Sequence, residues 1–339
     1  MGLQNQSDAY AGLLFGAADM AGIFTTGKMD PVSFKLGWAK LYENNNLKAD
    51  DLTLYVAAAS FSPTKDMKLG LNFYVIQDDT GKVSTANELP SDPGAGLNKK
   101  RIYTPGVDVS FGAGPATVSG FALYQFGKID FQNPATPDVD IKGFAADARV
   151  DLNAGPGKLF VEGLFISGGD NTSKEYKSIK TLSDMNASPG GNSFFARTDM
   201  SILLPNGDDI NTSSALVGAA GTATAGGAFV GNTSPGNAGR GIMHVATGFS
   251  MKLGDKLTGK VGAGYLAASK KLLVTDDTKK GKAMGTELNA NVNYNIQKGL
   301  DFGVYTAYAW LGNFYKSNVA GAVDPDNVYD VHFRLNYAF

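Results

Sequence analysis

Few residues in this chain are of types that perform covalent chemistry. Among 339 residues there is no Cys and there are two His, His244 and His332. The chain therefore has no disulfide, no thiolate nucleophile and too few imidazoles for an all-histidine zinc site. Neither histidine lies in a recognisable catalytic motif, and no P-loop, HExxH motif or calcium-loop spacing occurs. We predict no catalytic residue, no cofactor and no metal, and hence no enzyme.

Polar side chains do recur at a fixed spacing, most clearly in AMGTELNANVNYNI (283–296). Every second position there is polar: Glu287, Asn289, Asn291, Asn293 and Asn295. Leu288, Val292 and Tyr294 stand between them. A helix would scatter the asparagines around its circumference, whereas a period of two places them on one side. The pattern predicts a β-strand with one polar and one apolar face.

Charged residues occupy the polar positions of the other alternating segments. With the asparagines, the predicted polar lining is Lys35, Lys68, Asp108, Asp147, Arg149, Asp151, Glu162, Lys260, Glu287, Asp301, His332 and Arg334. Lys158, Lys252 and Asp330 extend the set to seven basic and seven acidic groups, a balance that favours no strong ion selectivity. Lysines beside short turns would equally suit a membrane rim, where their side chains reach toward headgroups.

The alternation predicts about 13 strands. One lies within 8–27, and the others span 31–42, 51–61, 67–77, 101–112, 115–128, 140–152, 157–168, 240–253, 256–269, 283–296, 299–312 and 328–339. The segments around 52–60 and 116–127 are less cleanly two-faced. Bacterial single-chain barrels have even strand numbers, so we favour 14 within a range of 12–16. In that interpretation residues 8–28 hold two short strands with a turn near Ala18–Met20; a lost N-terminal strand is the alternative.

The connections alternate between short and long. Short ones rich in Gly, Pro or Asp lie at 28–31, 62–67, 112–115, 153–157, 254–256 and 297–299. Their composition is typical of tight hairpin turns. Longer ones lie at 43–50, 78–100, 129–138, 169–239, 271–282 and 313–326. This order places every tight turn at one end of the strands and every long loop at the other.

The two-faced strands indicate which side meets water. A soluble sandwich must cover one face of each sheet with another sheet, and a closed sheet of this many strands is too wide for side chains to fill. A polar lumen and an apolar outer wall satisfy both constraints, and closure pairs every backbone group inside lipid. We therefore predict one all-β domain over 1–339: a transmembrane antiparallel up-and-down barrel with short periplasmic turns and long extracellular loops.

The chain ends in YDVHFRLNYAF, with aromatic or apolar residues at alternate positions and Phe last. This segment resembles the C-terminal strand of Gram-negative outer-membrane β-barrel porins. The resemblance implies that Phe333, Leu335, Tyr337 and Phe339 form the signal that the barrel assembly machinery reads. It also implies integral location in the outer membrane, beside lipid and lipopolysaccharide. No signal peptide precedes the barrel in this sequence, so we expect that any targeting segment has been removed.

The connection at 169–239 is far longer than a hairpin requires, and such loops are usually functional or disordered. Its segment 192–204 includes five large apolar residues: Phe194, Phe195, Ile202, Leu203 and Leu204. They would suit a loop that folds inward and narrows the lumen. An extracellular site for a partner explains them equally well, since exposed apolar patches often mark interaction surfaces.

These features predict a channel for passive diffusion of small hydrophilic solutes or ions. Two alternatives stay open: a sheath around a partner such as a multihaem cytochrome, as in porin–cytochrome barrels, and a substrate-specific exporter of the alginate-export type. Lys and Arg number 30 against 32 Asp and Glu, so the charge gives no reason to expect a nucleic-acid partner. The solute, the ion selectivity and the oligomeric state do not follow from the sequence.

Overall fold

A single curved β-sheet dominates the computed structural model. The structure describes residues 2–16, 18–43, 45, 48–81, 97–169, 174–185, 193, 195–204, 236–237, 239–270, 281–316 and 326–338. The sheet has 15 strands, and 14 of them form one continuous path from β1 to β15. The remaining strand, β10, pairs with β8 in parallel over two residues. The predicted all-β up-and-down fold with about 14 strands is confirmed.

The first half of the sheet contains β1 (Gly2–Gln6), β2 (Ala18–Met29), β3 (Val32–Tyr42), β4 (Leu52–Thr64), β5 (Met67–Asp78), β6 (Leu97–Ala113) and β7 (Ala116–Phe131). The second half contains β8 (Val139–Ala154), β9 (Gly157–Ile166), β10 (Glu175–Tyr176), β11 (Ile242–Lys252), β12 (Leu257–Ala268), β13 (Ala283–Gln297), β14 (Leu300–Leu311) and β15 (Val328–Tyr337). A short 3-10 helix, η1 (Leu182–Asp184), and a helical turn, α2 (Asn313–Lys316), lie in connections.

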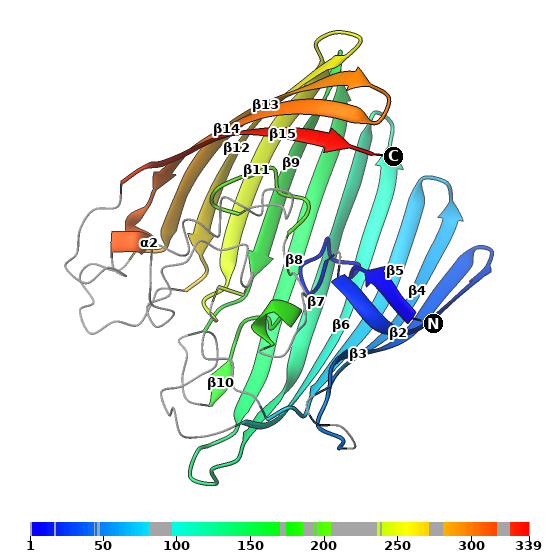
Figure 1. Ribbon diagram of the computed structural model, residues 1–339, viewed down its shortest axis with the longest axis vertical. Helices are drawn as coiled ribbons and strands as arrows, with labels where there is room; N and C mark the ends of the chain where they lie inside the picture. Colours follow the sequence, from blue (N-terminus) through cyan, green and yellow to red (C-terminus); the bar gives the residue numbers. More distant parts are fainter. Residues whose placement is uncertain are drawn as a thin grey trace.

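Every strand of the continuous path runs antiparallel to its neighbours (Figure 1). Tight connections such as Lys65–Asp66, Gly114–Pro115 and Lys298–Gly299 therefore lie at one end of the sheet, and the long connections lie at the other. We call these the short-turn end and the long-loop end. Because the path has an even number of strands, β1 and β15 at its two edges run antiparallel, as closure of a barrel requires.

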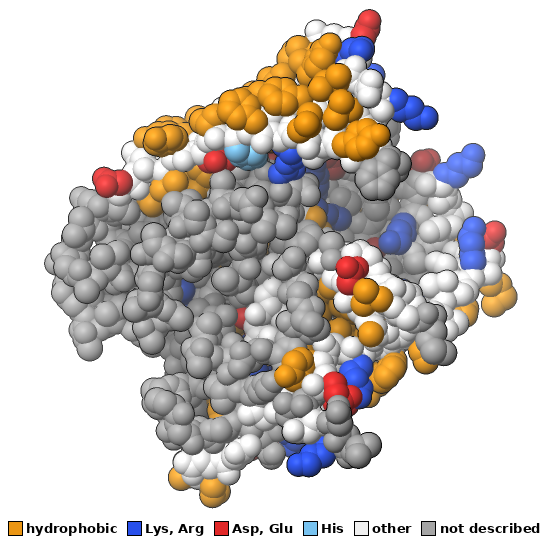
Figure 2. Space-filling model, viewed as in Figure 1, with side chains coloured by type: hydrophobic (Ala, Val, Ile, Leu, Met, Phe, Trp, Pro, Cys, Tyr) orange, Lys and Arg blue, Asp and Glu red, His pale blue; other side chains and the backbone are white. Residues whose placement is uncertain are grey.

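The two faces of the sheet differ as the alternation predicts. Large apolar residues on the convex face are exposed, for example Leu71 at 58%, Leu288 at 48% and Phe333 at 68%. Figure 2 shows such side chains covering the outside of the uppermost strands. A wall that exposes aromatic and aliphatic side chains along its whole height is suited to lipid. No helix in the described part of the chain is long and apolar enough to cross a membrane.

The N-terminal region departs from the sequence prediction. The additional strand is β1, at residues 2–6, and β2 begins at Ala18, where we expected a turn. Residues 8–15 are not a strand but a compact segment with turns. We call this segment the knot for its compactness; the name does not mean that the chain is knotted. Ala11 and Gly12 adopt positive φ values of 59° and 82°, a left-handed conformation that ends extended structure there.

Candidate functional site

Two chain segments lie against the concave face of the sheet. One is the knot, and the other, the insert, comprises the described residues 174–185, 193 and 195–204 of the connection between β9 and β11. β10, at the start of the insert, continues the sheet beside β8, and Figure 1 shows the segment that follows it on the concave side. Phe195, Ile202, Leu203 and Leu204 of the insert are almost wholly buried. Phe194 lies outside the described residues.

A carboxylate on β13 binds one end of the insert. Glu287 accepts hydrogen bonds from three successive main-chain N–H groups, those of Ser201, Ile202 and Leu203, at 2.6, 3.0 and 2.8 Å. The side chain of Glu287 is fully buried. Charged acceptors form stronger hydrogen bonds than neutral ones, and burial strengthens them further. Glu287 thus fixes the main chain of the insert rather than facing open water.

A second set of charges on β8 and β9 binds the insert at Arg197. Its guanidinium pairs with Asp147, while Arg149 donates to the Arg197 carbonyl oxygen at 2.7 Å. Arg149 also donates to Glu162 at 3.1 Å and lies over the Phe160 ring, 4.2 Å from its centroid. Each buried carboxylate of this cluster thus lies beside a guanidinium, which offsets part of the cost of burying its charge.

Beside this cluster, His244 of β11 lies with its Nε2 atom 3.4 Å from Glu162 Oε1, and both side chains are fully buried. The Phe195 ring packs edge-on against the imidazole, with centroids 6.4 Å apart. His244 is the third residue of β11, near the long-loop end of that strand, and it lies beneath the insert.

The insert also approaches β12 and β13 closely. Lys260 pairs with Asp199, and the Asn289 amide donates to the Asp199 carbonyl oxygen at 2.6 Å. A Cβ atom at Gly264 would come within 2.7 Å of Met200 Sδ, so the glycine leaves room for the insert. Wall residues of two neighbouring strands thus make room for this one segment and bind it.

The knot is organised around another buried carboxylate. Asp8 accepts four main-chain hydrogen bonds of 2.6 to 3.0 Å, from Tyr10, Gly12, Leu14 and Phe15. Burial raises the pKa of Asp8 to about 6, and the four N–H donors act in the opposite direction. The chain thereby closes on itself, and it meets the sheet through side chains of the wall, for example where the Ala9 N–H donates to the Tyr74 hydroxyl at 3.0 Å.

Aromatic contacts hold the knot against β5, β6 and β7. Tyr10 meets Tyr74 and Phe121 with ring centroids 5.7 and 5.3 Å apart, and Phe15 meets Tyr74 at 5.4 Å. A Cβ atom at Gly106 would lie 2.3 Å from the Tyr10 hydroxyl oxygen. The glycine on β6 is therefore required where the knot touches the wall.

Knot and insert bind each other directly. The main-chain N–H groups of Leu182 and Ala196 donate to the carbonyl oxygens of Leu14 and Ala11 at 3.0 and 2.8 Å. The Ser193 hydroxyl donates to the Leu14 oxygen at 2.8 Å. Two segments far apart in sequence thus form one body on the concave face.

The insert has a further contact at the long-loop end. The Gln125 amide on β7 donates to the Lys180 carbonyl oxygen at 2.9 Å and accepts from the Lys180 N–H at 2.6 Å. The Lys180 ammonium lies 4.2 Å from the centroid of the Tyr176 ring. Burial lowers the pKa of Lys180.

Other parts of the concave face are not covered by described segments. On β13 to β15, Asn293 accepts a hydrogen bond from the Tyr305 hydroxyl at 2.8 Å. The His332 ring stacks on Tyr305 with centroids 4.8 Å apart, and its Nδ1 lies 2.7 Å from Asp330. The Arg334 guanidinium lies 5.1 Å from the centroid of the same tyrosine ring. This polar layer we call the open wall.

A hollow of about 520 Å³ lies on β2 to β6, toward the short-turn end. Lys28, Lys35, Lys68, Asn72 and Asp108 are among its lining residues. The Lys68 ammonium and the Asp108 carboxylate are 3.2 Å apart. Lysines on neighbouring strands therefore stand beside a carboxylate in a space accessible to water.

All the polar residues predicted to line a pore lie on the concave face, but they fall into two groups. Asp147, Glu162 and Glu287 are 7%, 1% and 0% exposed because the insert covers them. The other positions are partly exposed: Lys35, Lys68, Asp108, Arg149, Asp151, Lys260, Asn289, Asn291, Asn293, Asp301, His332 and Arg334. Contact with a solute remains a prediction for this second group.

The sequence analysis missed Asp8, Tyr10, Gln125, Lys180 and Arg197. A signal for the knot was nevertheless present. The strands around 52–60 and 116–127 lacked a clean polar face because apolar residues point inward there. The structure buries these residues with the knot: Leu52, Leu54, Val56, Phe121 and Leu123.

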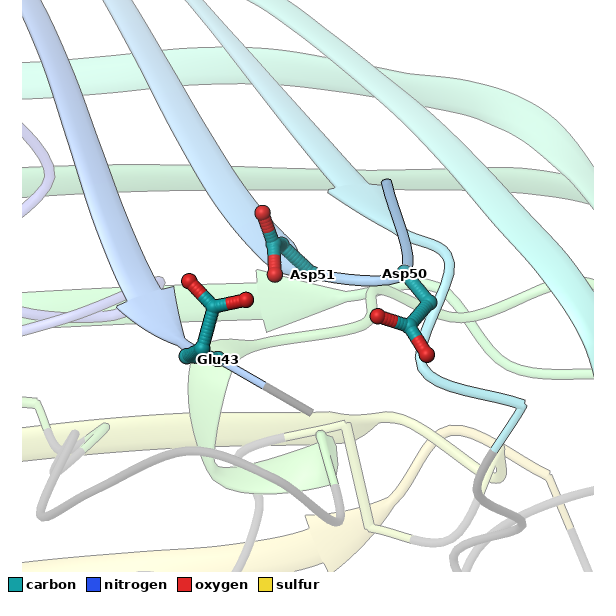
Figure 3. A group of neighbouring side chains, drawn as sticks. All are labelled: Glu43, Asp50 and Asp51. Carbon is teal, nitrogen blue, oxygen red and sulfur yellow. The ribbon is translucent and has the colours of Figure 1, made fainter. Parts of the chain in front are cut away.

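Three acidic residues lie close together at the end of β3 and the start of β4 (Figure 3). One carboxylate oxygen from each of Glu43, Asp50 and Asp51 lies within 4.8 Å of the others. The Lys40 ammonium lies 2.5 Å from Glu43 and 2.8 Å from Asp51. A lysine thus supplies the positive charge at two of the three carboxylates, and we assign no metal there.

The predicted assembly signal lies on an edge strand. Phe333, Leu335 and Tyr337 project outward from β15 and are 64 to 68% exposed. Phe339 lies outside the described residues. Recognition of these side chains by the assembly machinery remains a prediction.

Comparisons with solved structures show which known fold this chain shares. OccK3 (OpdO) of Pseudomonas aeruginosa aligns with a TM-score of 0.52 and 11% identity, over 99% of this chain and 74% of that chain. OccK5 (OpdH) of P. aeruginosa aligns with a TM-score of 0.50 and 9% identity, over 98% of this chain and 76% of that chain. OccAB4 of Acinetobacter baumannii aligns with a TM-score of 0.50 and 12% identity, over 94% of this chain and 65% of that chain.

No protein-family profile and no curated protein matches the sequence. The structural comparisons give no support to an alginate-export-type or a porin–cytochrome-type barrel in particular. At 9 to 12% identity the likeness is one of fold, and this chain has the antiparallel β-barrel fold of outer-membrane porins.

Proposed function

We propose that this protein is an outer-membrane channel through which small hydrophilic solutes or ions diffuse passively. The observation that carries the proposal is the division of the concave face. Knot and insert are fixed to one part of it, while the open wall and the lysine-lined hollow keep polar groups toward water. A polar passage narrowed by the chain's own segments is what a diffusion channel needs.

The same division makes a sheath around a partner protein a poorer explanation. A partner that filled the barrel would need the concave wall for its own contacts. Here Arg149, Lys260 and Glu287 instead bind the insert, and the inward glycines Gly106 and Gly264 make room for side chains of the same chain. The interior surface is therefore fitted to knot and insert rather than to a second protein.

The composition of the open part supports weak selectivity. Its basic groups include Lys35, Lys68 and Arg334, its acidic groups include Asp108, Asp301 and Asp330, and Lys68 lies 3.2 Å from Asp108. Mixed charges of similar number attract neither anions nor cations strongly. We therefore expect the passage to admit small polar solutes of either sign, limited by width.

The environment proposed for the barrel follows from its outer wall. The exposed aromatic and aliphatic side chains are expected to meet the hydrocarbon of an outer membrane, with the long-loop end extracellular. Lipopolysaccharide would then border the long-loop end. The proposal that the barrel assembly machinery inserts this protein rests on the residues of β15 alone.

A planar-bilayer recording of the purified protein tests the function. Stepwise, ohmic conductance at low protein concentration is the expected result, with a reversal potential near zero in a salt gradient because selectivity is weak. Osmotic swelling of proteoliposomes in sugars of increasing size should show a cutoff. The channel proposal would be contradicted if protein that migrates as a folded barrel gave no conductance steps and its liposomes were impermeable to the sugars.

A further inference from the structure

A water-filled passage needs a polar lining, but it does not require that the lining be built from asparagine. Three asparagines lie on the concave face of β13, and strand register adds one on β15, beyond Asp301 of β14. The three strands lie side by side in Figure 1. A further asparagine of β13, Asn289, is set apart because its amide donates to the insert. We call the others the amide ladder, and each of them is at least partly exposed: Asn291, Asn293, Asn295 and Asn336.

The wall uses only part of the hydrogen-bonding capacity of the ladder. The Asn293 amide donates to Asn291 Oδ1 at 3.3 Å, and the Asn295 amide donates to Asp301 at 2.7 Å. Among the described residues, no partner meets the N–H₂ group of Asn291, the side-chain oxygen of Asn295 or either end of the Asn336 amide. Hydrogen-bond donors and acceptors are therefore both open toward the lumen.

The charged groups among these amides already have partners in the wall. Asp301 accepts from the ladder, and Asp330 lies 2.7 Å from the His332 ring. The Arg334 guanidinium lies beside the Tyr305 ring, 5.1 Å from its centroid. An ion that bound one of these charges would have to displace its present partner, whereas an uncharged solute leaves the partners in place. The open wall thus presents its amides, more than its charges, to an entering solute.

The chemistry of an amide selects among solutes. An asparagine side chain offers N–H donors and carbonyl lone pairs together. An anion uses only the donors and a cation only the acceptors, so either ion leaves groups of the wrong polarity facing it. A hydroxyl group both donates and accepts, and a solute with several hydroxyls matches both kinds of group at once. The stacked rings of Tyr305 and His332, next to the ladder, offer an apolar surface for the C–H groups of such a solute.

A glycine holds the ladder close to the wall. A Cβ atom at Gly303 of β14 would overlap with Asn293 Oδ1 and with the Tyr305 ring. Because Gly303 has no side chain, the asparagine and the tyrosine lie against the backbone of β14, where the Tyr305 hydroxyl donates to Asn293 at 2.8 Å. The ladder is thus a surface along the passage and does not obstruct it.

We propose that the amide ladder binds uncharged polyhydroxylated solutes, that is, sugars and sugar alcohols, as they pass through the barrel. The open donors and acceptors of the ladder bind the hydroxyl groups, while the charges of the wall keep their own partners. This inference rests on the proposed channel function and names the class of solute that the channel favours. Width alone would admit any small polar molecule, whereas the ladder favours solutes whose groups both donate and accept hydrogen bonds.

Occlusion of single channels by a neutral sugar tests this binding. Raffinose is added to planar-bilayer recordings, and poly(ethylene glycol) of equal hydrodynamic size is the control, because its ether oxygens accept hydrogen bonds but do not donate them. Raffinose should lower the conductance in a saturable way and increase the current noise, whereas poly(ethylene glycol) should show no saturation. Equal effects of the two solutes in conducting channels would overturn sugar binding and leave the channel function intact. Folded protein without any channels would overturn both.

Two double variants locate the binding surface. Asn291→Ala with Asn295→Ala should raise the raffinose concentration for half-maximal occlusion at least about fivefold, because one hydrogen bond between neutral groups contributes roughly that factor. Lys35→Gln with Lys68→Gln, in the hollow, is the matched control: it should change ion selectivity and leave occlusion by raffinose intact. Heat-modifiable migration in gels reports whether each variant forms the barrel. If both folded variants lost occlusion equally, the ladder would not be the binding surface.

Discussion

The wall beneath the insert and the open wall are built from the same kind of polar strand face, yet their side chains have different surroundings. On β8, β9 and β13, Asp147, Glu162 and Glu287 are buried and bind the insert or its neighbours. On β14 and β15, Tyr305 and His332 stack at the surface of the uncovered part. An inward carboxylate is therefore not by itself a pore-lining charge, because a covering segment can bind it, through main-chain N–H groups at Glu287 and through a guanidinium at Asp147.

This difference changes which charges a solute would meet. With the three buried acids set aside, and with Arg149 and Lys260 bound to the insert, the remaining inward basic groups are Lys35, Lys68, Lys158, Lys252 and Arg334. The remaining acids are Asp108, Asp151, Asp301 and Asp330. The lining is still close to balanced, so weak selectivity is expected for a different reason than the sequence suggested.

Removing the covering segment should have the largest effect. Replacement of residues 175–235 by a brief Gly/Ser linker exposes the covered wall, and single-channel conductance should rise clearly. The barrel should survive, since the entropy of loop closure changes slowly with loop length. Unchanged conductance of the folded variant would place the insert outside the conducting path and restore the partner interpretation.

The next largest effect is expected when a charge is placed on one face of a strand or on the other. The comparison assumes that the concave face contacts water and that the convex face contacts lipid. Arg at Val292, which is 40% exposed on the convex face, should cost about 2–4 kcal/mol near the bilayer midplane. Arg at the adjacent Asn291 should be tolerated far better. Urea unfolding of both variants in lipid vesicles measures the difference, and equal destabilisation would show the register to be wrong.

A smaller effect is expected when one covered carboxylate is removed. Glu287→Ala leaves three buried N–H groups without their acceptor and should lower the free energy of unfolding by roughly 2 kcal/mol. Asn293→Ala on the open wall is the matched control and should change it by less than about 0.5 kcal/mol. In single-channel recordings, brief openings to higher conductance should appear in Glu287→Ala and not in Asn293→Ala. If both variants unfold alike, the two walls do not differ in the way described.

The smallest effect concerns pH. Burial raises the pKa of Asp8 to about 6 from 3.8, so the docked knot binds a proton more tightly than the undocked one. Docking should be strongest below about pH 4 and weaken as the pH rises to about 6. Conductance fluctuations should accordingly be rarer at low pH. Asp8→Asn, which cannot ionise, should remove this dependence; a dependence that persists in the variant must arise elsewhere.

The strands could be predicted from the sequence because lipid imposes a period of two on the wall. Predicted 67–77 and 283–296 correspond to β5 at Met67–Asp78 and β13 at Ala283–Gln297. The knot could not be predicted in this way, because Leu13, Leu14 and Phe15 look like a strand when their covering partners are unknown. The burial of Glu287 was also hidden, since its hydrogen-bond partners lie 84 to 86 residues away.

The hydrogen bond from Ser193 to Leu14 joins residues 179 positions apart. Contacts between residues so distant in the chain form late, after the strands between them have paired. We therefore expect knot and insert to interlock after most of the wall has formed. A newly inserted barrel should pass through a period in which its bore is unobstructed and ions leak across the membrane. The time needed for the two segments to find each other then sets how long the cell is exposed to that leak.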